Sequence, residues 1–389
     1  MKIILAPDSF KGSLTSLEVA EAMEAGIKRA RPDADCIRIP MADGGEGTVQ
    51  SLLDAVGGEL ISCSVKGPAG LRVTAAYGML ADGRTAVIEM AAASGLALVR
   101  DSSKNPFKTT SYGTGELIRD ALDRGARKII LGIGGSATND GGTGMAQALG
   151  VVFRDADGRV IRENGAGGML HKIESVDLSC IHSGLRQAHI QVACDVENPL
   201  TGENGASRVF APQKGANEEM VKALDANLKH LADVIDRELG VDVDPIPGAG
   251  AAGGMGAGLL VFAGAELKRG IDLISKATSI ERHLRSADLV LTGEGRVDFQ
   301  TAFGKTPAGI ARLAGEYGVP VVAIGGGLAD DAGEVFKHGI GGLEPAIARD
   351  MTLDEALVNS RKYIANAAER AIRLIKIGQT MKVSTDDTD

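Results

Sequence analysis

The sequence predicts an α/β protein in which the first and last parts of the chain share one parallel sheet. Apolar, strand-like runs at residues 2–7 and 36–40 are each followed by a helical pattern, and this alternation is typical of parallel sheets. The alternation stops near residue 60 and returns near Asp288. The chain also contains 53 glycines in 389 residues, about twice the ordinary usage, so many tight turns are expected.

The N-terminal elements are expected in the order strand, helix, strand and helix, over residues 2–7, 17–30, 36–40 and 49–56. Ser16 is the expected N-cap of the first helix, and Pro32 lies beyond its end. Asp8 begins the loop after the first strand, and residues 43–48 form the loop after the second. Because ligands bind at the carboxyl ends of parallel strands, we expect both loops at a binding edge.

The region from residue 60 to residue 88 has a different pattern, with short apolar runs separated by turn signals. This pattern predicts entry into a second domain with antiparallel hairpins, whose strands cover residues 61–65, 72–78 and 85–89. Further along the chain, we expect helices over residues 116–124 and 218–239 and strands at residues 128–131 and 191–194. The longer of these helices carries one apolar stripe, as an amphipathic helix does.

The last third of the chain returns to alternating strands and helices, over residues 289–291, 307–317, 319–324 and 353–375. Pro307 suits the first turn of its helix. We therefore expect this part of the chain to complete the first domain, with a polar, frayed tail after it.

Composition and charge argue against several classes of partner. The net charge of −9 argues against a nucleic-acid surface. The four cysteines are scattered without a C-x-x-C pair, which indicates free thiols and a reducing compartment. The first residues reach Pro7 too soon for a signal peptide, and the uncharged run at residues 245–265 is too rich in glycine and alanine for a membrane span. We expect a cytoplasmic protein with no membrane partner.

Residues 128–150 have the strongest pattern of a ligand site. An apolar strand leads into a glycine-rich loop, and a short helical pattern follows and ends near Gly150. Glycine lets a ligand approach the backbone closely, and free N–H groups at the start of a helix bind anions. We expect this loop to hold phosphate through its backbone N–H groups, with candidate binding residues Gly134, Gly135, Ser136, Thr138 and Asn139.

The same stretch also matches part of a dinucleotide fingerprint, through Gly132, Gly134, Ala137 and the later acidic residue Asp155. That fingerprint needs a helix that starts within it, and residues 138–142 break any helix there. A Walker A motif is excluded because residue 299 is Phe where glycine is required. Ser136 is not part of a Gly-x-Ser-x-Gly motif, so a Ser-His-Asp hydrolase is not expected.

Charged side chains accompany glycine in several loops that follow expected strands. The loops carry Asp8 and Lys11; Asp43 and Glu46; Asn139 and Asp140; Asp195 and Asn198; and Glu294, Arg296, Asp298 and Lys305. Acidic residues on such turns suit Mg²⁺ binding or base catalysis, and basic residues suit phosphate charge. Each loop taken alone is also ordinary turn chemistry. Their recurrence favours a site for phosphoryl transfer, which depends on positioning and charge neutralisation.

Long motifs spaced through the chain resemble those of the type-1 glycerate kinase family, from the N-terminus to about residue 378. They include APDSFKGSLTS at residues 6–16, MADGGEGT at 41–48, GIGGSATNDGGTGMAQALG at 132–150, PQKGA at 212–216 and TGEGRVDFQTAFGKTPAG at 292–309. The resemblance implies transfer of the γ-phosphate of ATP to D-glycerate, with Mg²⁺. The implied product is 2-phosphoglycerate, with 3-phosphoglycerate left open.

The resemblance also implies the architecture. One flavodoxin-like α/β domain would comprise residues 1–60 and 285–378, and an inserted mixed α/β domain would comprise residues 61–284. A polar tail would follow at residues 379–389. The active site would lie in the cleft between the two domains, a common position for sites.

From their charges and positions, we expect the loop residues to divide into catalytic, binding and metal roles. The expected catalytic residues are Asp195, as base or metal ligand, and Lys11, Arg296 and Lys305, which would meet carboxylate or phosphate charge. The expected substrate- and phosphate-binding residues are Asp8, Ser9, Gly134, Gly135, Ser136, Thr138, Asn139 and Asn198. The expected Mg²⁺ ligands are Asp43, Glu46, Glu294 and Asp298.

Three other functions stay open at this point. The first is a kinase for another small hydroxy acid, and the second is a dinucleotide-dependent dehydrogenase that uses residues 132–155. The third is a non-catalytic sensor of sugar acids. The sequence also leaves a homo-oligomer open.

Overall fold

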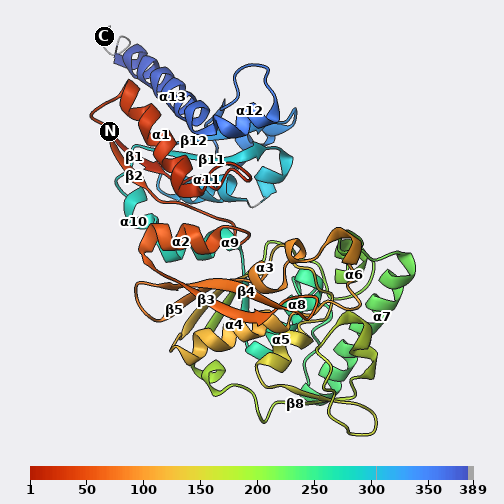
Figure 1. Cartoon of the computed structure of the whole chain (residues 1–389). Coiled ribbons are helices and arrows are strands. Elements are labelled where there is room, and N and C mark those ends of the chain that lie inside the picture. The colour runs from red at the N-terminus through yellow and green to blue at the C-terminus, as the bar shows by residue number, and fades with distance from the viewer. Residues whose placement is uncertain (304, 384–389) are drawn as a thin grey trace. The chain divides into compact units, whose positions relative to one another are not determined.

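The computed structural model describes residues 1–303 and 305–383, which form two compact units (Figure 1). The first unit comprises Met1–Asp43, Gln50–Val56 and the chain from Ile274 onward. The second unit comprises Gly44–Val49 and Gly57–Leu273. The predicted fold class, two α/β domains of which one contains both ends of the chain, is confirmed.

The sheet of the first unit has five parallel strands in the order β13-β12-β11-β1-β2. The strands are β1 (Lys2–Leu5), β2 (Asp35–Arg38), β11 (Leu289–Val297), β12 (Val321–Leu328) and β13 (Gly342–Pro345). This is the strand order of flavodoxin-like folds. β1 pairs with β11, from Ile3 opposite Leu289 to Leu5 opposite Leu291, so the two ends of the chain meet at the centre of the sheet.

The helices that accompany this sheet come mostly from the C-terminal part of the chain. They are α1 (Ser16–Ala30), α2 (Thr48–Val56), α9 (Gly270–Thr278), α10 (Glu281–Leu284), α11 (Thr306–Glu316), α12 (Leu353–Val358) and α13 (Ser360–Val383). α1 and α13 lie side by side (Figure 1). A Cβ atom on Gly26 would lie 1.9 Å from the carbonyl oxygen of Ala365, so this close packing requires glycine. The core beneath these helices includes Ile27, Leu291 and Ile364.

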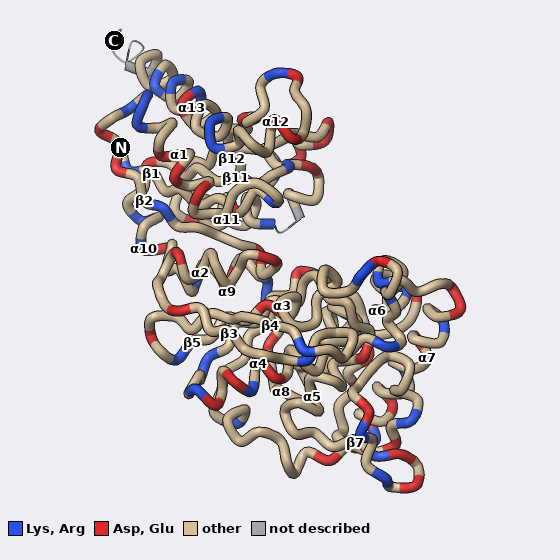
Figure 2. The backbone as a smooth tube through the Cα atoms, in the orientation of Figure 1, with Lys and Arg blue, Asp and Glu red and all other residues tan. Residues whose placement is uncertain are grey.

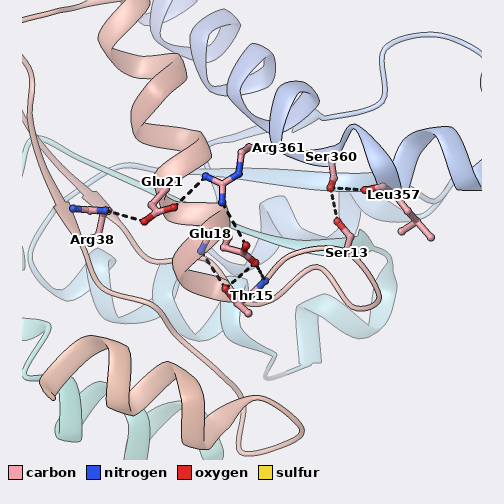
Figure 3. A network of polar contacts seen from close by, with 8 residues as sticks. All are labelled: Ser13, Thr15, Glu18, Glu21, Arg38, Leu357, Ser360 and Arg361. Carbon is pink, nitrogen blue, oxygen red and sulfur yellow. Dashed lines mark hydrogen bonds and ion pairs between the residues drawn. The ribbon is translucent and has the colours of Figure 1, made fainter. Parts of the chain in front are cut away.

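Polar contacts hold the start of α1 against α13 (Figure 3). Basic residues recur along α13 (Figure 2), and Arg361 lies 3.1 Å from Glu21 and 3.5 Å from Glu18. The N-cap of α1 is Thr15, not Ser16 as predicted, because Thr15 and Glu18 form a reciprocal capping box. Ser16 is instead buried, with its hydroxyl 2.6 Å from that of Ser51.

The second unit contains a six-stranded mixed sheet in the order β10-β9-β6-β5-β4-β3. The strands are β3 (Gly58–Lys66), β4 (Arg72–Leu80), β5 (Thr85–Glu89), β6 (Lys128–Gly132), β9 (His189–Ala193) and β10 (Glu266–Lys268). β3, β4 and β5 pair antiparallel, as the turn signals predict, and the other pairs are parallel. A separate two-stranded sheet consists of β7 (Val152–Arg154) and β8 (Ser175–Asp177).

The helices of the second unit are α3 (Ala91–Ser94), α4 (Tyr112–Asp123), α5 (Thr143–Ala148), α6 (Ala206–Phe210), α7 (Glu218–Leu239) and α8 (Ala251–Ala263). Most of the uncharged glycine-alanine run forms α8, which is largely buried. A Cβ atom on Gly253 would lie 2.0 Å from the carbonyl oxygen of Thr138, so the small residues of α8 let it approach the 132–144 loop. No helix in the described parts of the chain is long and apolar enough to cross a membrane.

Three predicted element boundaries in the last third of the chain differ from the structure. The expected helix at 353–375 is two helices, because α12 ends at Asn359, whose side chain donates to the carbonyl oxygen of Glu355 at 3.0 Å. α13 then continues to Val383, so residues 379–383 of the predicted tail are helical, and residues 384–389 lie outside the described residues.

β11 also extends to Val297, because it pairs with the glycines of β12. Glu294 and Arg296 therefore lie in a strand rather than in a loop.

Candidate functional site

An acidic cluster lies at the carboxyl edge of the first unit's sheet and comprises Asp8, Asp43, Glu294 and Asp298. Asp8 follows β1 and is half-buried. One of its carboxylate oxygens accepts from the backbone N–H of Ser9 at 2.6 Å, and the other accepts from the Thr306 hydroxyl at 2.7 Å. Burial raises the pKa of Asp8 to about 7, and the charges of Asp43 and Glu294 push it in the same direction.

Glu294 joins this acidic cluster to Lys305. Its Oε1 accepts from the Thr301 hydroxyl at 2.5 Å, and its Oε2 lies 3.6 Å from Lys305 Nζ. Burial raises the pKa of Glu294, and nearby Asp298 and Asp43 add to this effect, whereas Thr301 and Lys305 oppose it. The structure thus brings four of the predicted site residues into electrostatic reach of Glu294, which is itself a fifth: Asp8, Asp43, Asp298 and Lys305.

Two predicted cationic residues of the first unit lie apart from these contacts. Lys11 and Arg296 are exposed, and neither makes an ion pair with any residue in the described ranges 1–303 and 305–383. Their side chains are therefore available to a ligand, and their proposed roles rest on their position beside Asp8 and Glu294 in the sequence.

Glu46, the fourth predicted metal ligand, belongs to the second unit. It is exposed, and its charge raises the pKa of Glu89, although burial is the larger cause of that shift. Glu89 accepts from the backbone N–H of Val49 at 2.8 Å. Across the described residues, no three or more His, Cys, Asp or Glu side chains gather closely enough to hold a metal ion by themselves.

Asp195 and Asn198 follow β9 in the second unit, as predicted for a strand-end loop. Asp195 is exposed, and its Oδ1 accepts from the backbone N–H of Gly270 at 3.0 Å. Asn198 donates from its side chain to the carbonyl oxygen of Asn204 at 2.8 Å. Asn198 is thus held within its own loop, whereas Asp195 is held by the start of α9.

The 132–144 loop connects β6 to α5 and packs tightly against its neighbours. A Cβ atom on Gly132 would lie 2.1 Å from the carbonyl oxygen of Gly44, so this position requires glycine. Gly135, Gly141 and Gly142 have φ values of +70°, +59° and +72°, which other residues rarely adopt. These glycines are therefore needed for the backbone conformation and packing of the loop, whether or not a ligand approaches it.

Asp140 occupies the position at the start of α5 that an anion would take. It is fully buried, and its carboxylate accepts from the Ser111 N–H at 2.8 Å, the Ser111 hydroxyl at 2.7 Å and the Gly142 N–H at 3.2 Å. Burial raises its pKa, and these hydrogen bonds oppose that shift. Because the helix start is satisfied within the protein, the predicted phosphate contact of this loop is left to its Gly134–Asn139 part.

Lys214 is a functional candidate that the sequence patterns missed. It is 2% exposed, and its Nζ donates to the Ser136 hydroxyl oxygen at 2.8 Å and to the Thr138 carbonyl oxygen at 2.7 Å. Burial lowers its pKa to about 7, and the charge of Asp140 opposes this shift. The sequence contains its PQKGA motif, but Lys214 follows α6 rather than a strand. The expectation that site residues follow strands therefore did not include it.

The loop also contains two buried polar atoms without hydrogen-bond partners in the described chain, Thr138 Oγ1 and Asn139 Oδ1. The other end of the Asn139 side chain donates to the Ser207 hydroxyl at 3.0 Å. Such orphaned groups are rare in native proteins and call for an explanation. By contrast, Asp155 of the dinucleotide fingerprint accepts from the N–H groups of Asp157 and Arg159 in an exposed turn, so the fingerprint's acidic residue serves that turn.

The comparisons with known proteins agree along nearly the whole chain. Residues 3–376 match the Glycerate kinase family. The chain is 51% identical over 381 residues to a glycerate kinase of Bacillus subtilis, covering 98% of this chain and 99% of the relative. It is 50% identical over 378 residues to the glycerate 2-kinase of Escherichia coli, covering 97% and 99%. A solved structure of a Salmonella typhimurium LT2 protein assigned as a glycerate kinase 2 superposes with a TM-score of 0.90, at 50% identity, over 98% of this chain and 99% of that one.

Proposed function

The chain belongs to the glycerate kinase family, and on that basis we propose that it transfers the terminal phosphoryl group of ATP to D-glycerate. The products would be ADP and 2-phospho-D-glycerate, because the Escherichia coli relative bears the name glycerate 2-kinase. The observation that carries this proposal is the match at half identity over almost the full length of both chains. The residues matched to the family, 3–376, span every candidate site residue from Asp8 to Lys305.

The charged residues suit the two demands of phosphoryl transfer, which are to neutralise phosphate charge and to accept the proton of the attacking hydroxyl. Lys11, Arg296 and Lys305 would meet the phosphates or the glycerate carboxylate. Asp195, exposed at the end of β9, would accept the hydroxyl proton or bind the metal.

The remaining predicted residues would bind and orient glycerate. Asp8, with its pKa at about 7, can hold a proton at neutral pH and so donate a hydrogen bond to a substrate oxygen. Ser9 and Asn198 would contribute polar contacts beside it and beside Asp195, respectively.

The acidic cluster provides the carboxylates that a bound Mg²⁺ ion would need. The carboxylates of Asp8, Asp43 and Glu294 lie close enough to raise the pKa values of Asp8 and Glu294, so a divalent cation would relieve their repulsion. They do not form a complete metal site by themselves within the described chain. These residues therefore fit an ion that arrives with its phosphate ligands, as Mg²⁺ usually does. Asp43, Glu294 and Asp298 would hold it, and the ion would neutralise phosphate charge.

Glu46 is a separate case among the proposed metal ligands, because its charged neighbour within its own unit is Glu89.

We also assign the enzyme to the cytoplasm. Support comes from the cysteines, because the four thiols Cys36, Cys63, Cys180 and Cys194 are all free, as is usual in a reducing compartment.

ADP release from ATP and Mg²⁺ tests the proposed function, with D-glycerate, L-glycerate, glycolate, tartronate or no acceptor present. Turnover with D-glycerate alone is the expected result. Turnover with another acid in preference would point to a different hydroxy-acid kinase. Folded protein that releases no ADP with any acceptor would overturn the proposal, and a titration with NADH would then test the dehydrogenase alternative.

A further inference from the structure

Lys214 is an unusual lysine because its whole side chain is buried and forms no ion pair with the described residues. It lies in the short 3₁₀ helix η5 (Pro212–Lys214), and it is 2% exposed. Within the described chain, no carboxylate oxygen lies within 4.0 Å of its Nζ, and the charge of Asp140 acts on it from farther away. Lysines are almost never fully buried unless they are paired. Within the described chain, two hydrogen bonds rather than an ion pair therefore compensate for the burial of its ammonium.

The hydrogen bonds of Lys214 fix the direction of the Ser136 hydroxyl. While Lys214 is protonated its ammonium can only donate, so Ser136 Oγ accepts in the 2.8 Å bond. The hydroxyl hydrogen of Ser136 is therefore directed elsewhere, and no acceptor for it is found among the residues described here. Ser136 is 8% exposed, and its backbone is held by a bridge to Gly95. It presents a polarised donor from a fixed position.

Two neighbouring residues of the loop, Thr138 and Asn139, also have polar side-chain atoms without a hydrogen-bond partner in the described chain. Thr138 gives its carbonyl oxygen to Lys214 at 2.7 Å, whereas its fully buried hydroxyl has no partner in the described chain. Asn139 Oδ1 is likewise buried and unpartnered. A buried polar atom without a partner costs free energy, which a bound ligand or an ordered water would recover. These two orphaned atoms belong to residues within three positions of Ser136 in the sequence.

We propose that Ser136 and Lys214 form an anion subsite, in which the Ser136 hydroxyl donates to an anionic oxygen of the substrate. Lys214 is a positioning residue that orients this hydroxyl and supplies the positive charge behind it. The inference rests on the proposed function for the identity of the anion, which is a phosphoryl oxygen of the nucleotide or the carboxylate of glycerate. Both groups present the same chemistry, so experiment has to distinguish the two.

Steady-state kinetics and calorimetric binding of the full chain test this subsite with Ser136→Ala, Lys214→Met and Lys214→Arg. The matched control is Lys222→Met, at an exposed lysine on α7 of the same unit. We expect Ser136→Ala and Lys214→Met to weaken one substrate by about tenfold to a hundredfold, with a smaller change in kcat. A rise in the KM for ATP and in the Kd for ADP assigns the subsite to phosphate. A rise in the KM and Kd for D-glycerate assigns it to the carboxylate.

Three further readouts separate positioning from a merely structural role. Because Lys214 acts through Ser136, the double variant Ser136→Ala/Lys214→Met should bind the affected substrate about as weakly as whichever single variant binds it less tightly. Lys214→Arg, which keeps the charge and the donors, should recover part of the affinity. The Tm of Lys214→Met should equal or exceed that of the unmodified chain, because a buried ammonium is costly to desolvate. Ser136→Ala, which removes only one oxygen, keeps the test valid if Lys214→Met fails to fold.

The inference and the proposed function fail in different ways. Binding of ADP and D-glycerate within twofold of the unmodified chain, in both Ser136→Ala and Lys214→Met, would overturn the subsite while leaving kinase activity intact. An unmodified chain without turnover would overturn the proposed function. The subsite would still stand in that case if the two variants lost affinity for ADP or D-glycerate.

Discussion

The acidic cluster of the first unit and the buried Lys214 of the second unit carry opposite charges, but burial shifts a pKa in both of them. Burial raises the pKa of Asp8 to about 7, and burial lowers the pKa of Lys214 to about 7. The neighbours differ, however. Asp43 and Glu294 push the pKa of Asp8 further in the direction of burial, whereas Asp140 opposes the effect of burial on Lys214.

This difference indicates what each region lacks. Carboxylates that repel one another are relieved by a cation, and a buried ammonium beside an unsatisfied hydroxyl is relieved by an anion. A magnesium nucleotide brings both charges. We therefore expect the acidic cluster to respond to Mg²⁺, and Ser136 with Lys214 to respond to an anion.

The largest expected effect concerns Asp195, which belongs to neither region. Asp195→Asn keeps an acceptor for the Gly270 N–H and removes the base. We expect kcat to fall by about 10² to 10⁴, measured as ADP release at saturating substrates. Glu197→Gln, an exposed neighbour, is the control. Normal turnover by Asp195→Asn would exclude it as the base and direct the search to the acidic cluster.

Lys305 tests whether the acidic cluster also carries a phosphate-binding cation. Lys305→Ala removes the charge 3.6 Å from Glu294 Oε2. We expect the KM for ATP or D-glycerate to rise by roughly tenfold to a hundredfold, because a charge-assisted contact is lost. Lys337→Ala, at an exposed lysine of the same unit, should leave both KM values unchanged. Equal kinetics in the two variants would remove Lys305 from the site.

Asp8 gives a pH-dependent effect on stability. Its native pKa of about 7 exceeds the ordinary value of 3.8, so the native state binds the extra proton between these values. Its contribution to stability is thus lost as the pH rises from about 4 to about 7. We expect Asp8→Asn to raise the free energy of unfolding by about 1–3 kcal/mol at pH 8 and by little at pH 4.

Chemical denaturation at the two pH values measures this difference. Asp330→Asn, an exposed position of the same unit, should show no such pH dependence. A stabilisation by Asp8→Asn that is the same at both pH values would mean that Asp8 is not protonated in the native state at pH 4 to 7.

The smallest expected effect is that of Mg²⁺ alone. Because the described carboxylates form no complete metal site, Mg²⁺ without nucleotide should stabilise the chain weakly, by roughly 0.4 kcal/mol when its concentration equals Kd. ADP and Mg²⁺ together should raise the Tm further than either alone, and EDTA should remove the difference. A large rise in Tm with Mg²⁺ alone would show a preformed metal site. It would contradict the view that the acidic cluster needs phosphate ligands to bind the ion.

The fold was predictable where local signals agree with packing. α7 spans Glu218–Leu239 as predicted, because its apolar stripe lies between an Asn217 cap and Gly240 at φ +69°. The parallel sheet followed from the alternation of strands and helices. The wrong boundaries lie where a tertiary contact decides, as with Ser16, which is buried against Ser51, and with the break at Asn359.

The candidate site was predictable only in part, for a similar reason. Asp8 and Glu294 stand at or near the ends of adjacent parallel strands, so their proximity follows from strand order. Lys214 follows a short helix, and a lysine next to glycine is ordinarily exposed. Its burial depends on packing against the 132–144 loop, 70 or more residues earlier in the chain, and no local pattern records that contact.

The most direct test of the central claim is the phosphorus NMR spectrum of the product formed from D-glycerate, ATP and Mg²⁺. Phosphate on the 2-hydroxyl couples to the single proton on carbon 2, so the account predicts a doublet that appears as ADP forms. A triplet from the two protons on carbon 3 would contradict the assignment of the 2-hydroxyl. The absence of any new phosphate ester, from folded protein, would contradict the proposed phosphoryl transfer itself.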